Sequence, residues 1–245
     1  MSGPAAPVQP MGLFDRLIGV LFDPTPAFAD LAARPTGWWL PLVLLMVITV
    51  GFIFAFTQRV GWERFMRQQL ESSPRVQQLS VEQREQALQQ QLRFVPTVAH
   101  IQGALAWPVI TLVVGGAFLF VFNILLGAQV VFRQAYAVVC YGCLPQAVGG
   151  LLAIVVMFLK DPADFDLQNP VATNLAAFLD PSATPKWLQA LGGSLDLFSF
   201  WTLLLLATGF AAAGRKISWS KACTWVVASW VLWVAVKTGG AWIFS

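Results

Sequence analysis

Charged side chains are scarce in this 245-residue chain: 15 are Lys or Arg and 12 are Asp or Glu, together 11% of all residues. An ordinary soluble domain carries roughly 25%. Hydrophobic residues make up 57% and include 19 Phe and 11 Trp, which is more apolar surface than a globule of this size hides from water. The composition therefore excludes a water-soluble globule and requires lipid as part of the solvent.

Charge is also absent from long continuous runs. No Asp, Glu, Lys or Arg lies between Arg34 and Arg59, and Lys237 is the only charge after Lys221. About 20 apolar residues suffice for a helix to cross the hydrocarbon core, and a transmembrane barrel would alternate apolar and polar residues. We therefore predict an all-α, polytopic membrane helical bundle of five spans. The predicted spans are about 38–57, 104–126, 136–159, 197–214 and 222–243.

The segment before the first span divides into two parts. Residues 1–10 are small and Pro-rich, which predicts a disordered tail, and residues 11–36 predict an amphipathic helix followed by a short helix that Thr25 caps. In the first of these helices Asp15 and Arg16 share one narrow face, and apolar residues fill the rest. Such a helix lies in the membrane interface or packs on the protein's own spans. The sequence leaves both alternatives open.

The main polar segment, 58–100, lies between the first two spans. Its apolar residues recur at helical spacing, and Ser80 with Gln83 forms a capping box. We predict a polar helical hairpin inserted into a membrane domain that extends over 37–245.

Cysteine and histidine are nearly absent, which limits metal and redox chemistry. His100 is the only histidine, and no carboxylate lies near it in the sequence, so we expect no metal site and no cofactor. Cys140 and Cys143 form a CxxC pair, which a thiol oxidoreductase could use. The alternative is that both are small apolar residues that let helices approach closely. The net charge of +3 is spread over both faces, so nucleic acid is not an expected partner.

Polar residues in or beside the spans are the remaining candidates for function. Asp196 and Lys237 are the charges nearest the hydrocarbon core, and they would lie at the same end of the bundle, where they could pair. Asn123 and Gln146 could hydrogen-bond across the bundle, and Pro145 could bend the third span. These residues suggest a channel or transporter for a small or lipidic solute as an alternative function. Their plainer role, with the small residues around them, is to hold helices together or to form a homo-oligomer contact.

Several sequence strings resemble the Yip domain (Ypt/Rab-interacting) family of membrane proteins, in its bacterial branch. They lie around the five apolar windows, in the order and spacing of that family. The strings are LFDRLIGVLFDP at 13–24 with Phe28, FNILLG at 122–127 running into FRQAYAVV at 132–139, Pro145, Pro170 with TNL at 173–175 (including Asn174), and DLF at 196–198 with Trp201 and Gly209.

The resemblance implies a five-span protein of a cell membrane, expected here to be the bacterial inner membrane, with a cytoplasmic N-terminus and the C-terminus on the far side. Counting Lys and Arg does not settle that orientation. The family's known role implies a non-enzymatic scaffold or adaptor in membrane organisation or trafficking-like processes. Its eukaryotic members bind Rab-type GTPases, but the short N-terminal tail and the inserted hairpin here depart from that pattern. GTPase binding is therefore not carried over to this chain, whereas the bilayer and other membrane proteins are expected partners. The family tends to have small or hydroxyl residues where Cys140 and Cys143 stand, which favours packing.

Overall fold

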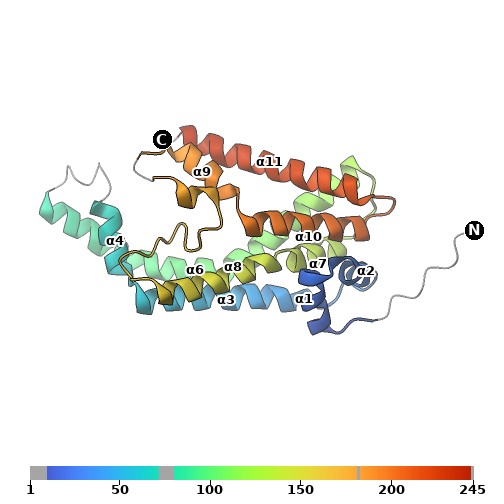
Figure 1. Cartoon of the computed structure of the whole chain (residues 1–245), viewed down its shortest axis with the longest axis horizontal. Helices are drawn as coiled ribbons and strands as arrows, with labels where there is room; N and C mark the ends of the chain where they lie inside the picture. The colour runs from blue at the N-terminus through green and yellow to red at the C-terminus, as the bar shows by residue number, and fades with distance from the viewer. Residues whose placement is uncertain (1–9, 72–79, 181–182, 244–245) are drawn as a thin grey trace, which may run out of the picture.

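The computed structural model describes residues 10–71, 80–180 and 183–243, and all its regular elements there are helices (Figure 1). The tail predicted at 1–10 lies, except for residue 10, outside the described residues. One isolated antiparallel bridge joins Asn174 to Asp196. The elements are α1 (Leu13–Phe22), α2 (Pro24–Ala33), α3 (Trp39–Arg59), α4 (Trp62–Glu71), α6 (Val81–Phe120), the π-helix η1 (Val121–Leu125), α7 (Phe132–Gly142), α8 (Leu144–Leu159), the 3₁₀-helix η2 (Leu175–Phe178), α9 (Lys186–Ser194), α10 (Leu197–Ala213) and α11 (Trp219–Ile243).

Four helical segments of the described chain are long and apolar enough to cross a membrane: α3, α6 with η1, α7 with α8, and α11. The fifth predicted span corresponds to α10, an apolar helix of 17 residues. These five segments run back and forth along the bundle, which places α1 and α2 at the end opposite the C-terminus (Figure 1). We call the end that carries α1 and α2 the N-end, and the end that carries α4 and α9 the C-end.

The helices differ from the sequence prediction at three places. The second arm of the polar hairpin is not separate from the second span, because α6 runs unbroken for 40 residues, about 60 Å. Its capping box is present: Gln83 N donates to Ser80 Oγ at 3.2 Å and Ser80 N to Gln83 Oε1 at 3.0 Å. The third span is interrupted at Cys143, with Pro145 in the first turn of α8. The short helix before the first span, α2, begins at Pro24 rather than after Thr25. A proline fits the first turn of a helix, where no backbone donor is needed.

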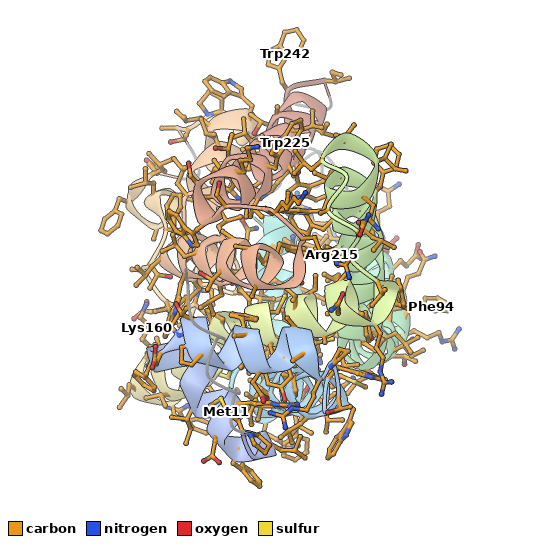
Figure 2. The ribbon with its side chains drawn as sticks, turned by 90° about the vertical axis from the view of Figure 1, so that its right-hand side faces the viewer. Met11, Phe94, Lys160, Arg215, Trp225 and Trp242 are labelled. Atoms are coloured by element: carbon orange, nitrogen blue, oxygen red, sulfur yellow. The ribbon has the colours of Figure 1, made fainter. Side chains whose placement is uncertain are left out.

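The outer surface of the spans is apolar. Side chains such as Val113 on α6 and Leu232 on α11 are about two-thirds exposed, at 65% and 67%. Figure 2 shows Phe94 of α6 and Trp242 of α11 pointing away from the ribbon. A water-soluble protein rarely exposes so much contiguous apolar surface. Lipid is the solvent that this surface fits.

The core lies toward the N-end, where α2 packs against α7 and α10. Phe122 and Phe210 are fully buried and their rings stack with centroids 4.5 Å apart. Gly209 lets both α7 and α2 approach closely, because a Cβ there would collide with Val138 Cγ1 of α7 and would come within 2.9 Å of Phe28 Cε1 of α2. The N-terminal helices are therefore part of the membrane domain's core and not an appendage to it.

Candidate functional site

A buried ion pair fixes α1 to α2 at the N-end. Arg16 Nε lies 2.6 Å from Asp30 Oδ2, and these residues are 4% and 0% exposed. Arg34 also pairs with Asp30, one helical turn along α2. Arg16 Nη1 donates to the carbonyl oxygen of Thr36 at 2.9 Å, just before the first span. The cluster joins α1, α2 and the start of α3.

Sequence reasoning missed this cluster. It placed Arg16 on the narrow polar face of α1 but did not single out Asp30. Of the two charged residues on that face, Arg16 is buried and Asp15 is exposed. On the apolar side, Phe14, Ile18 and Phe22 are 73%, 61% and 79% exposed. The available signal was that Asp30 is the only charged residue between Asp23 and Arg34, in a stretch that is otherwise rich in small and apolar residues. The two alternatives for α1 are thus compatible, since one face packs on the protein and the opposite apolar face is exposed.

Asn123 closes the turn between the second and third spans rather than bonding across the bundle. Its Nδ2 donates to the carbonyl oxygen of Val130 at 2.7 Å, and its Oδ1 accepts from Val130 N at 2.8 Å. Gln134, just after this turn, donates to the carbonyl oxygen of Ala32 at 2.8 Å and so ties the turn to α2. Both amides therefore have structural roles at the N-end.

Within the spans, polar side chains pair across helices. Gln146 Nε2 on α8 donates to Thr202 Oγ1 on α10 at 3.3 Å, as a cross-bundle role predicts. Trp107 Nε1 on α6 donates to Thr49 Oγ1 on α3 at 2.8 Å. Trp201 is partly buried and packs on the main core. Each polar pair satisfies groups that lipid could not.

At the C-end, Asp196 and Lys237 do not form the suggested pair. Asp196 caps α10 by accepting from Ser199 N at 3.0 Å, and it also accepts from Thr173 Oγ1 at 2.7 Å. Lys237 Nζ donates to Ser194 Oγ at 3.0 Å. Asn174 caps η2 by accepting from Ala177 N at 3.1 Å. Capping the first turn of α10 is by itself a sufficient reason for Asp196 to stand at this depth.

Cys140 and Cys143 are free thiols with 0% and 7% exposure. Cys140 packs with Leu42 and Tyr136, and Cys143 belongs to the main core. A thiol that exchanges with a partner must be reachable, and these two are covered. Their burial favours the packing interpretation.

One cavity lies at the C-end of the bundle and a second lies near its middle. The C-end cleft, of about 880 Å³, is bounded by α4, the 163–169 loop, η2, α9 and Lys237 of α11. The apolar cavity, of about 310 Å³, lies between α3, α6 and α8 and is lined by residues such as Ile48, Phe52 and Ala153. Lys237 and Asn174 line the first and Gln146 the second, whereas Asn123 and Asp196 line neither. The predicted polar residues therefore do not converge on one cavity.

The apolar spans and their exposed surface define a multi-pass helical membrane protein. In the described residues no group of three or more His, Cys, Asp or Glu side chains is placed to hold a metal. A sequence profile of the Yip1 domain matches residues 18–238. The chain belongs to the Yip1 domain family, as the sequence strings indicated. No curated protein and no solved structure gives a match.

Proposed function

We propose that this protein is a non-enzymatic scaffold or adaptor that organises other membrane proteins. The observation that carries the proposal is that the polar side chains within and beside the spans form hydrogen bonds inside the chain itself. Asn123, Gln146 and Asp196 each bond to a backbone or hydroxyl group of the chain itself. These three polar groups thus do not converge on one site within the spans, as catalysis or ion-coupled transport there would require.

We further propose that the N-end faces the cytoplasm of a bacterial inner membrane, with the C-terminus outside. The five apolar segments separate the two ends, and the short N-end turn at 214–218 contains Arg215 and Lys216, close together beside two spans. Basic residues in short loops favour the cytoplasmic side. Topology reporters fused after residues 36, 130, 218 and 245 test this: the first three should report cytoplasm and the last the far side.

The exposed face of α1 is proposed to lie in the cytoplasmic membrane interface. The buried Arg16–Asp30 pair fixes which side faces outward, and Phe14, Ile18 and Phe22 then form one apolar stripe at i, i+4 and i+8. In proteoliposomes, brominated lipids should quench a Phe14→Trp variant by more than they quench the parent protein, whose 11 tryptophans set the background. With Asp15→Trp, on the adjoining exposed polar side, we expect weaker quenching. Equal quenching at both positions would contradict an interfacial helix.

The scaffold role is tested by in-membrane photo-crosslinking of the full chain in its native host. We expect one or a few membrane proteins to crosslink in reproducible stoichiometry, and purified protein in liposomes to show no solute flux above empty vesicles. Flux above that background would instead support the channel or transporter. Loss of thiol-trapping in a Cys140→Ser/Cys143→Ser variant, with a growth defect, would support the oxidoreductase. Crosslinking that does not differ from an unrelated five-span control would overturn the scaffold.

A further inference from the structure

We propose that the C-end cleft and the apolar cavity together bind one phospholipid with a zwitterionic amine headgroup. The headgroup lies in the cleft of about 880 Å³ and an acyl chain in the cavity of about 310 Å³. Both volumes are in the range of about 300–1,000 Å³ that is usual for small-molecule sites. The proposal goes beyond the scaffold role, which requires no bound ligand.

The two cavities share one wall, formed by the loop after α8. Leu167 lines both of them. Phe165, which lines the cleft, packs on Phe52, which lines the apolar cavity, with ring centroids 6.4 Å apart. A ligand with a polar and an apolar part can therefore occupy both cavities across this loop.

The charges of the cleft match a zwitterion. Its lining contains two lysines, Lys186 and Lys237, and two aspartates, Asp164 and Asp166. In the described part of the chain neither lysine is in an ion pair. A phosphate accepts charge-assisted hydrogen bonds from lysines, and an ammonium group donates them to carboxylates. A purely anionic headgroup would leave the two carboxylates facing negative charge.

One of these carboxylates is held in place before any ligand arrives. Asp166 Oδ1 accepts from Gln168 N at 2.8 Å, and its Oδ2 accepts from Asn169 Nδ2 at 3.0 Å. A carboxylate offers about four lone-pair sites, so Asp166 keeps acceptor capacity for an ammonium group. The loop thus presents an oriented acceptor to the cleft.

The apolar cavity suits hydrocarbon because its polar groups already have partners. Trp107 bonds Thr49, and Gln146 bonds Thr202. Along α3 the cavity ends at Phe52, seven residues or about 10 Å before the helix ends at Arg59. The cleft begins beside Phe165, which packs on Phe52 and Phe56 of α3, and extends to α4, the helix that follows α3. The two parts of the site therefore lie at the depths where a lipid places its chain and its headgroup.

The test is native mass spectrometry of the purified full chain in detergent, titrated with phosphatidylethanolamine. We expect the Lys186→Gln/Lys237→Gln variant to bind about tenfold more weakly or worse, since it loses charge-assisted hydrogen bonds. Both lysines are exposed, so the variant removes no core packing. Lys160→Gln, an exposed lysine at the same end but outside the cleft lining, should bind as the parent does.

The chain-binding part is tested by filling the cavity. Ala153→Leu should weaken phosphatidylethanolamine binding, whereas Ala212→Leu, at an exposed position of α10 that lines neither cavity, should not. Parent-like binding by the lysine double variant would overturn the site. Phosphatidylglycerol binding as tightly as phosphatidylethanolamine would overturn the zwitterion, and soluble phosphorylethanolamine binding as tightly would overturn the acyl chain. The titration needs no partner protein, so its outcome is independent of the scaffold test.

Discussion

The two ends of this bundle are built differently. At the N-end, the connections are short and their polar groups are bonded to one another: Asn123 holds Val130, and Arg215 N donates to the carbonyl oxygen of Ala128 at 2.8 Å. At the C-end, a long connection after α8 leaves a cleft of about 880 Å³. Closed polar networks stabilise a structure, whereas binding sites are built from concave surfaces on loops. The comparison assigns stability chiefly to the N-end and recognition to the C-end.

The largest effect is expected at the buried ion pair. Asp30→Asn removes the negative charge that compensates the buried Arg16, which should cost about 3–5 kcal/mol of unfolding free energy. Thermal unfolding of the purified protein in detergent measures the loss. Asp15→Asn, an exposed carboxylate on α1, is the matched control and should change little. An equal loss of unfolding free energy in both variants would contradict a special contribution of the buried ion pair to stability.

A Cβ at Gly209 should produce the next largest loss. Gly209→Ala places a methyl group against Val138 Cγ1 of α7 and within 2.9 Å of Phe28 Cε1 of α2, and overpacking of this kind costs about 1–3 kcal/mol. Gly116→Ala, at a helical position of α6 with no atom within 4 Å of the added Cβ, should be neutral or slightly stabilising. The same unfolding assay compares the two. If Gly116→Ala were the more destabilising, the close packing of α2 and α7 against α10 at Gly209 would not matter for stability.

The smallest difference concerns one asparagine at each end. Asn123→Ala loses two bonds to a backbone that is otherwise buried, at a cost of about 1–3 kcal/mol. Asn169→Ala loses a bond to Asp166 in the C-end loop, and we expect it to cost less than about 1 kcal/mol. Hydrogen exchange of residues 126–131 should accelerate in the first variant only. Faster exchange there in Asn169→Ala would show that the two ends are not independent.

Much of the fold follows from where charge is absent. The stretches without charged residues predict the spans. The sequence strings that resemble the Yip family predict the Yip1 domain, which the profile match over 18–238 confirms. Local signals such as Ser80 with Gln83 also predict correctly, because a capping box acts within four residues. The break at Cys143 was only half predicted: Pro145 indicated a bend, but the start of a new helix depends on different neighbours, since α7 packs on α6 and α10 whereas α8 packs chiefly on α3.

The candidate site was harder to predict because it depends on contacts between distant segments. Asp196 and Lys237 were placed at the same end of the bundle, yet each bonds to a different hydroxyl group, Thr173 and Ser194. Helical periodicity gives the face on which a side chain lies but not the partner opposite it. The inward direction of Arg16 was missed for the same reason.

The sequence by itself determined the solvent of this protein and its number of apolar segments, since both depend on composition over windows of about 20 residues. It also determined the family. Only the tertiary structure decided that α1 buries Arg16 and turns its apolar stripe outward, and that one loop separates a polar cleft from an apolar cavity. Those outcomes depend on which surfaces meet when α2 packs on α10 and the loop after α8 folds over α3.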